Sequence, residues 1–268
     1  MDKVKKYKIV FDCAKNFLAE IIAQHPGLSK PILEKHLEHE SKFDTMEDAT
    51  KRLIISLQNR NMMASVINFK GREALFASIL CGYNARTILK KYPGPGRLFE
   101  VFKKKFDIRN ARSKGNLWWK FSEGIVSGSQ FLASFKNKDE FDRFIKNFAL
   151  NKFTKAALPM LLGQEIKGFG FALACDFLKE LGYRDYPKPD VHLIEIFSEL
   201  GLCQTRDPYE VYKAMIEMSE TVGEDAYTVD KIFWLISSGR FYLTDIHAGR
   251  KRDEFIKYTL TAPGYSLT

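Results

Sequence analysis

The residues whose types and spacing point to chemistry begin at a pair of glycines near the middle of the chain. Gly168 and Gly170 are separated only by Phe169, and two glycines this close permit a tight turn whose backbone can approach a ligand. An apolar helical pattern resumes at Phe171, so N–H groups at a helix start lie beside the turn and can receive an anion such as phosphate. The segment 159–181 therefore predicts a helix, a hairpin and a helix, with the phosphate of a DNA backbone as its candidate ligand.

A carboxylate follows this hairpin at the distance of one helix and a short return. Asp190 comes about twenty residues after Gly170, directly behind Pro189, and is placed to cap a helix that begins at Val191. This interval can bring the carboxylate back beside the hairpin. A capping role alone contributes about 1 kcal/mol to the helix, and capping and catalysis are compatible.

The elements that position these residues are predicted to be helices almost throughout. Apolar residues recur at three- and four-residue intervals along the chain, and alternating β-branched runs are almost absent. Pro159 is expected to start a new short helix, and Thr45 with Asp48 forms a T-x-x-D capping pattern for a helix that follows it. The remaining helices are expected after Ser29 and over 4–23, 72–80, 97–106, 117–125, 139–148, 152–158, 191–200, 208–219, 227–237 and 248–260. The predicted fold class is all-α.

Composition narrows the class of protein further. The 268 residues carry 42 Lys and Arg against 33 Asp and Glu, a formal charge of +9 that weakly favours a polyanionic partner. No apolar run is long enough to span a membrane, and the N-terminus lacks a signal-peptide pattern. We therefore expect a protein that is not secreted and that lies in the cytoplasm, associated with the nucleoid, or in the nucleus. We also expect a monomer. The four cysteines form no C-x-x-C pair, which argues against a metal site and an iron–sulfur cluster.

Together these residues resemble the helix-hairpin-helix DNA glycosylases, and among them the 8-oxoguanine and alkyladenine glycosylases. The resemblance rests on Gly168-Phe169-Gly170, on the small residue Ala174, and on Asp190-Val191-His192, which is similar to the family's D-x-H. It implies a bilobal helical fold with the active-site cleft between two lobes. The central lobe would be about 65–190, with the hairpin at 159–181, and the second lobe would combine 1–64 with 191–268.

The resemblance also implies a reaction. The family's aspartate stabilises the positively charged sugar left when the glycosidic bond breaks, a role that falls here on Asp190. Members that also cleave the strand carry a lysine two residues after the second glycine, and this chain has Ala172 there. The expected enzyme is therefore monofunctional: water attacks, an abasic site remains, and no cofactor is required, although a monovalent cation can sit at the hairpin.

Further site residues follow from the same resemblance. The base pocket is expected to include Ala172, Asp176, Trp118 and Trp119. Asp176 could instead form a surface ion pair with Lys179. The two tryptophans could instead belong to the core, next to the basic stretch 103–114. The turn before Arg86 is expected to supply the wedge that fills the duplex when a base is flipped, with Tyr83 or Asn84 at its tip, unless these are a core tyrosine and a helix cap. The expected DNA contacts are Lys167, Gly168, Phe169, Gly170, Tyr83, Asn84, Arg86, Lys188 and His192.

The predicted partner is double-stranded DNA with a modified base, and the base itself is left open. Oxidised guanine, alkylated purine and a phage-type modified pyrimidine such as glucosylated hydroxymethylcytosine all remain, so the role is base-excision repair or defence against phage. Two other functions also remain open. One is a helix-hairpin-helix DNA-binding protein without catalysis, and the other is an N-glycosidase of the same fold that acts on free nucleosides.

Overall fold

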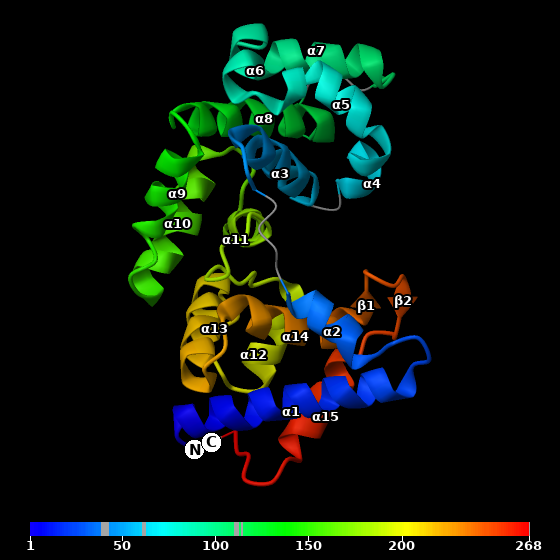
Figure 1. Cartoon of the computed structure of the whole chain (residues 1–268), viewed down its shortest axis with the longest axis vertical. Helices are drawn as coiled ribbons and strands as arrows, with labels where there is room; N and C mark the ends of the chain where they lie inside the picture. Colours follow the sequence, from blue (N-terminus) through cyan, green and yellow to red (C-terminus); the bar gives the residue numbers. More distant parts are fainter. Residues whose placement is uncertain (39–42, 61–62, 110–112, 114, 268) are drawn as a thin grey trace. The chain divides into compact units, whose positions relative to one another are not determined.

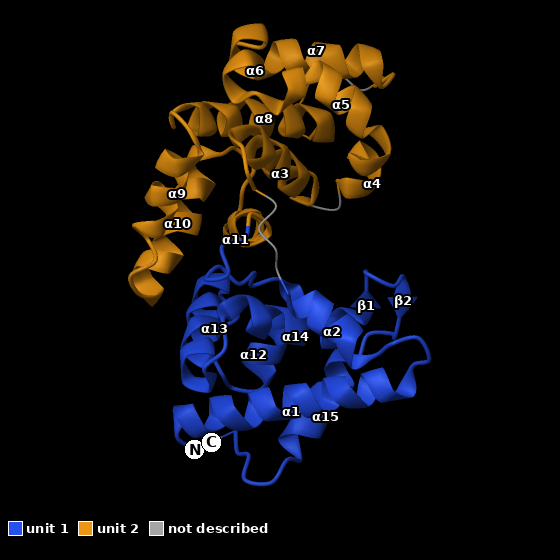
Figure 2. Ribbon diagram, viewed as in Figure 1, with its two compact units in different colours: residues 1–40, 182–268 blue, residues 41–181 orange. Residues whose placement is uncertain are grey.

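The structure, a computed structural model, describes residues 1–38, 43–60, 63–109, 113 and 115–267. Almost all of the regular structure is helical, which confirms the predicted all-α class (Figure 1). The chain forms two compact units: residues 1–40 with 182–268 make unit 1, and residues 41–181 make unit 2 (Figure 2). Arg112 and Lys114 of the basic stretch lie outside the described residues.

Unit 1 combines the two ends of the chain around one apolar core. Tyr7, Val10 and Phe11 of the first helix are buried in the same cluster as Phe197 and Phe233 from the C-terminal part. Its elements are α1 (Lys3–Gln24), α2 (Lys30–Leu37), α12 (Val191–Glu199), α13 (Pro208–Val222), α14 (Ala226–Ser238), β1 (Arg240–Phe241), β2 (Ile246–His247) and α15 (Arg252–Leu260). The two short strands pair antiparallel as a hairpin.

Unit 2 is built around α3 (Met46–Gln58) and α8 (Leu117–Ala133), which pack closely together. Gly124 and Gly128 of α8 permit this approach, because a Cβ on either would lie 2.6 or 2.5 Å from the side chain of Leu57 or Leu53 on α3. The other elements are α4 (Ala64–Ile67), η2 (Lys70–Arg72), α5 (Glu73–Ile79), η3 (Cys81–Tyr83), α6 (Ala85–Lys91), α7 (Pro95–Lys105), α9 (Lys138–Lys146), α10 (Lys152–Glu165) and α11 (Phe171–Glu180), where η marks a 3₁₀ helix.

Helix starts with a polar cap were predicted well, and one start was wrong. Thr45 accepts a hydrogen bond from the Asp48 N–H at 3.1 Å while Asp48 accepts one from the Thr45 N–H at 2.9 Å, as the capping pattern predicts. Pro159 does not start a helix: it lies inside α10, which begins at the Asn151 cap and runs on to Glu165. Asn151 accepts hydrogen bonds from the N–H groups of Phe153 and Thr154, so the helix already has its start before the proline.

The unit boundaries lie at 40/41 and 181/182, whereas the sequence places the lobe boundaries near 65 and 190. The first differs because α3 packs on α8 and thus belongs to unit 2. The second differs because the return segment 182–190 is hydrogen-bonded to α14 of unit 1.

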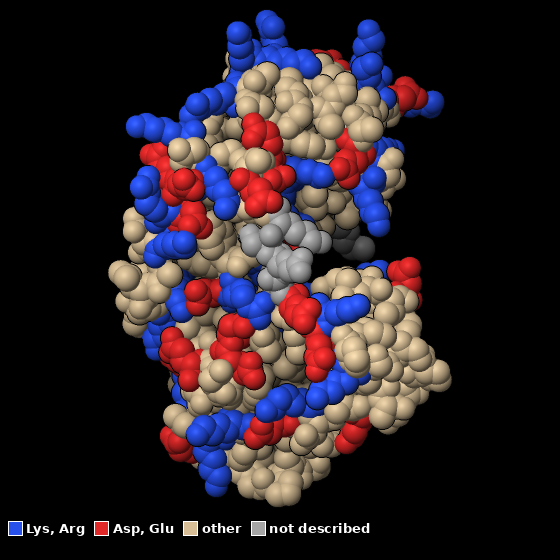
Figure 3. Space-filling view, viewed as in Figure 1, with Lys and Arg blue, Asp and Glu red and all other residues tan. Residues whose placement is uncertain are grey.

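Two further properties are the distribution of charged side chains on the surface and the apolar length of the helices. On the face shown in Figure 3, lysine and arginine side chains are interspersed with acidic ones over both units, so the positive surplus forms no single patch on that face. Among the helices of the described residues, none combines the length and the apolar character that crossing a membrane requires.

Candidate functional site

The two glycines of the predicted hairpin have different backbone conformations. Gly168 has a φ of +91°, in the left-handed region that favours glycine, and it forms the bend between α10 and α11. Gly170 is extended, with φ −92° and ψ 168°, and is the N-cap of α11. No side chain caps this helix start in the described structure, and a Cβ placed on Gly170 would meet no atom within 4 Å. The start of α11 is thus open to a ligand.

Two cationic side chains accompany this hairpin. Lys167 is exposed, and its backbone N–H donates to Ser127 Oγ at 2.8 Å, which fixes the hairpin on α8. The guanidinium of Arg60 lies so close to Gly168 that a Cβ there would be 2.6 Å from Nη1. Among the residues that the structure describes, no carboxylate forms an ion pair with Arg60 or Lys167. Arg60 was missed by sequence reasoning, because it is more than one hundred positions away from the hairpin along the chain.

Phe169 faces inward, between the two glycines. Its side chain is buried and its ring lies 5.8 Å from that of Phe177 in α11. Only its backbone is thus available to the predicted DNA contact. Ala172, in the first turn of α11, is half-buried, and Ala174 is fully buried, as expected for a small residue where helices pack closely.

Asp176 is buried, but its contacts differ from those predicted. Its Oδ2 accepts hydrogen bonds from Ser56 Oγ at 3.1 Å and from Arg52 Nη2 at 3.2 Å, both on α3. This oxygen therefore joins α11 to α3, and the place of Asp176 in a base pocket stays a prediction.

Trp118 and Trp119 belong to the aromatic core of unit 2. The Trp118 ring stacks on Phe106 with centroids 4.6 Å apart and an interplanar angle of 23°, and the Trp119 ring meets Phe99 edge-on at 5.7 Å. Both tryptophans are buried, which is the core arrangement that the sequence also allowed. The guanidinium of Arg72 lies 6.0 Å from the Trp118 ring centroid, a further protein neighbour of this tryptophan.

The turn proposed as a wedge is occupied by structural contacts. Cys81, Gly82 and Tyr83 all have positive φ, at 55°, 62° and 66°, an unusual run for two residues that are not glycine. Tyr83 is buried and donates to the Glu73 carbonyl at 3.3 Å. Burial, and after it the Glu73 charge, raise the pKa of Tyr83 to about 12. The tyrosine is therefore a core residue, as the alternative interpretation of the turn held.

Asn84 and Arg86 are engaged on the other side of this turn. The Asn84 side chain accepts from the Thr87 N–H at 2.9 Å, as the cap of α6, and donates to Glu47 at 2.7 Å. Arg86 is exposed and donates to the Phe135 carbonyl at 3.0 Å. Both residues line a surface cavity of about 370 Å³ in unit 2.

Asp190 caps α12 in unit 1. Its Oδ1 accepts hydrogen bonds from the N–H groups of His192 at 3.0 Å and Leu193 at 3.3 Å. The residue is half-buried, as is His192. The capping role predicted for Asp190 is therefore confirmed, and its catalytic role stays a prediction.

The segment that carries Asp190 is braced by α14. The Asp230 carboxylate, 1 % exposed, accepts from the backbone N–H of Lys188 at 2.7 Å, two residues before Asp190. Sequence reasoning placed the Lys188 side chain on DNA and did not identify Asp230 as the support of this segment. The signal was present only as an aspartate within an apolar helical run.

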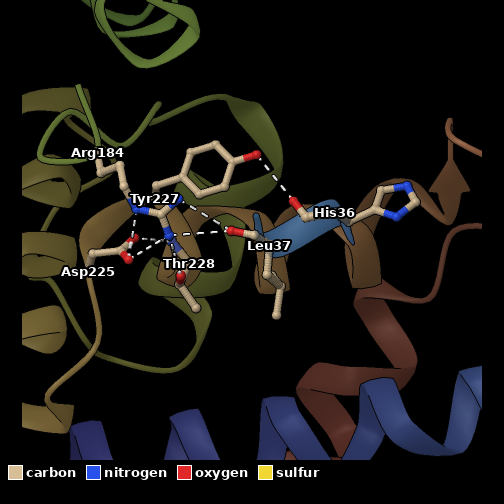
Figure 4. Close-up of polar contacts among 6 residues, drawn as sticks. All are labelled: His36, Leu37, Arg184, Asp225, Tyr227 and Thr228. Carbon is tan, nitrogen blue, oxygen red and sulfur yellow. Dashed lines mark hydrogen bonds and ion pairs between the residues drawn. The ribbon is translucent and has the colours of Figure 1, made fainter. Parts of the chain in front are cut away.

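A second brace fixes the beginning of the same segment. The Arg184 guanidinium donates to Asp225 Oδ2 at 2.9 and 2.6 Å, to Thr228 Oγ1 at 3.2 Å and to the Leu37 carbonyl at 3.3 and 3.4 Å (Figure 4). The Tyr227 ring centroid lies 4.8 Å from this guanidinium, and the Tyr227 hydroxyl donates to the His36 carbonyl at 3.1 Å (Figure 4). Arg184 thus ties the return segment to the end of α2 and the start of α14.

The structure therefore groups the predicted residues in two sets. Lys167, Gly168 and Gly170 lie together on the hairpin of unit 2, and Lys188, Asp190 and His192 lie together in unit 1. In the described part of the chain, no group of three or more His, Cys, Asp or Glu side chains is arranged to hold a metal ion.

Comparison with known proteins gives no match: neither a family model, nor a curated protein, nor a solved structure is significantly similar to this chain.

Proposed function

We propose that this chain is a DNA glycosylase that hydrolyses the N-glycosidic bond of a modified base and leaves an abasic site. The observation that carries the proposal is the hairpin: an uncapped start of α11 after a left-handed glycine, with Arg60 and Lys167 beside it and no carboxylate paired with either in the described structure. Backbone N–H groups and two cations at one turn suit a phosphate of the DNA backbone.

Asp190 would supply the chemistry in this proposal. As the bond between C1′ and the base breaks, the bonding electrons leave with the base and the sugar becomes positively charged. The Asp190 carboxylate would stabilise that charge, and a water oxygen would then bond to C1′ while its proton passes to Asp190 or to solvent. The cap hydrogen bonds to the His192 and Leu193 N–H groups would hold the carboxylate in place.

The direct test combines a panel of modified duplexes and modified phage genomes with alkaline cleavage at abasic sites. Asp190→Asn is the informative variant, because asparagine caps helices as well as aspartate does but carries no charge. We expect Asp190→Asn to bind DNA and to lose base release by about 10²-fold or more. Asp207→Asn is the matched control, since Asp207 caps α13 through the Tyr209 and Glu210 N–H groups in the same way.

The outcomes separate this proposal from its nearest alternative. The engagement of Asp190 in a helix cap also suits a helix-hairpin-helix protein that binds DNA without catalysis. That alternative predicts DNA binding without base release from any substrate, whereas release of bases from free nucleosides alone would indicate a nucleoside N-glycosidase. Equal activity of Asp190→Asn and the wild type would remove Asp190 from the mechanism.

Ala172 makes a separate prediction about strand cleavage. Because this position holds no amine, no Schiff base forms there and borohydride should not trap the protein on DNA during base release. A covalent adduct would show that a lysine elsewhere attacks the sugar, and the monofunctional assignment would then be wrong.

A further inference from the structure

The β-hairpin of unit 1 presents two large apolar side chains at its tip. The strands Arg240–Phe241 and Ile246–His247 are joined by a short turn that begins with Tyr242 and Leu243. Tyr242 is 49 % exposed and Leu243 is 52 % exposed. Such exposure is unusual for two adjacent apolar residues on a turn, where polar side chains prevail.

This tip stands on a rigid base. Phe241 is fully buried in the core of unit 1, and the Ala248 N–H donates to the Gly239 carbonyl at 2.8 Å. The backbones of Gly239 and Gly249 are so close that a Cβ on Gly239 would lie 1.9 Å from the Gly249 carbonyl oxygen. The hairpin is therefore fixed at both ends of its turn.

Tyr242 is held by a buried lysine. Lys231 Nζ donates to the Tyr242 hydroxyl at 3.0 Å and lies 4.9 to 5.5 Å from the ring centroids of Tyr242, Tyr227 and Trp234. The backbone N–H of Leu243 donates to His36 Nε2 at 3.4 Å. These contacts fix the ring of Tyr242 and the backbone of Leu243, while the Leu243 side chain extends into solvent.

The same part of α14 supports the segment of Asp190. Lys231 holds the hairpin tip, and its direct neighbour Asp230 holds the Lys188 backbone two residues before Asp190. The hairpin tip and the proposed catalytic carboxylate thus depend on consecutive residues of one helix in one unit.

The charges around the tip favour a polyanion. Arg240 and Arg250 are exposed, and neither has an ion-pair partner in the part of the chain that the structure describes. Asp245 is the one acidic side chain between the two strands, against the two arginines. An apolar tip flanked by free cations is suited to a nucleic-acid duplex, whose phosphates lie on either side of its stacked bases.

We infer that the Tyr242–Leu243 tip is the wedge that enters duplex DNA and fills the space left by the flipped nucleotide. This inference rests on the proposed function, which requires such a wedge. It assigns the role to a different element from the turn at Tyr83 and Asn84, whose side chains are buried or engaged in a helix cap. Leu243 would stack between the neighbouring bases, and Tyr242, held by Lys231, would support it.

The test compares the affinity for two duplexes of the same sequence, one intact and one with a tetrahydrofuran abasic-site analogue opposite 2-aminopurine. We expect the wild type to prefer the abasic duplex. Leu243→Ala should weaken binding to the abasic duplex by about tenfold or more, because a buried leucine contact is lost, and leave binding to the intact duplex within about twofold. The fluorescence change of 2-aminopurine on binding should disappear in parallel.

Leu150→Ala is the matched control, because Leu150 is 78 % exposed and lies in unit 2 outside any helix. It should behave as the wild type does. Two results would overturn the wedge role and leave the proposed function standing. In the first, Leu243→Ala keeps the wild-type preference for the abasic duplex; in the second, it loses the same affinity for both duplexes. If the wild type binds neither duplex, the proposed function fails, and the wedge fails with it.

Discussion

Gly168 and Gly170 look equivalent in the sequence, and the structure gives them different tasks. Gly168 is in the left-handed region, where a side chain costs roughly 1–2 kcal/mol. Gly170 has a conformation that any residue adopts, and it has open space around it. A glycine is thus required at position 168 by the bend, whereas at position 170 its only evident use is to leave room for a ligand.

This difference predicts the behaviour of Gly170→Ala. We expect its stability to fall by no more than about 1 kcal/mol, since no backbone strain or clash arises. Its affinity for duplex DNA should fall by about tenfold, because the new methyl group would stand where a phosphate is proposed to approach the backbone. Fluorescence anisotropy with a labelled duplex and urea unfolding measure the two effects.

Gly94→Ala is the control for this experiment. Gly94 is likewise an extended N-cap glycine of unit 2, at the start of α7, with no atom within 4 Å of a Cβ. The control should lose a similar amount of stability and retain wild-type affinity. Equal affinities of the two variants would argue against phosphate binding at the hairpin.

Local residue patterns were predictable, and contacts between distant segments were not. Thr45 and Asp190 were identified as helix caps from the sequence, because a cap acts within three residues of its own position. The Arg52–Asp176 contact and the place of Arg60 beside Gly168 join segments more than one hundred residues apart. The three- and four-residue spacing of apolar side chains predicts which face of a helix is buried, but it does not predict which distant residue lies against that face.

At the scale of elements, α14 supports two features of unit 1. Its N-cap Asp225 and its residue Asp230 brace the return segment, and Lys231 fixes the tip of the β-hairpin. The sequence predicted this helix over 227–237 and assigned its side chains mainly to packing. Its polar residues are buried, and burial of that kind depends on partners that an amphipathic pattern does not identify.

The tip of the β-hairpin is hydrogen-bonded to a titratable side chain, His36. This side chain is buried, its Nδ1 lies 2.8 Å from the Ile32 carbonyl, and its Nε2 accepts from the Leu243 N–H. Burial, opposed by the Ile32 contact and aided by the nearby Lys231 charge, lowers the pKa of His36 below 6.5. Protonation would place a second positive charge near Lys231 and remove the acceptor of the Leu243 N–H.

The sign of the effect on stability follows from this lowered pKa. In the unfolded chain His36 takes up a proton near pH 6.5, and in the folded chain only at a lower pH, so the stabilisation is complete above 6.5 and is lost as the pH falls through the folded pKa. We expect wild-type stability to fall more steeply below pH 6.5 than that of His36→Gln, as measured by urea unfolding from pH 7.5 to 5. Parallel slopes would contradict this assignment.

At the scale of the whole molecule, unit 2 is one continuous segment and unit 1 is made of two. Unit 2 has its own aromatic core around Phe76, Phe102 and Trp118. We expect residues 41–181, expressed alone, to fold cooperatively and to give a helical circular dichroism spectrum with a single urea transition. A spectrum of an unfolded chain would show that unit 2 depends on the rest of the molecule.

The nested order of the two units has a consequence for synthesis on the ribosome. Helix α1 emerges first, yet the partners of its apolar face, α13, α14 and α15, are translated only after all of unit 2. Domains generally form as units during translation, so unit 2 can be complete while Tyr7, Val10 and Phe11 still lack their neighbours. For that interval the nascent chain exposes an apolar helix, which makes α1 the segment most in need of a chaperone before the C-terminal helices arrive.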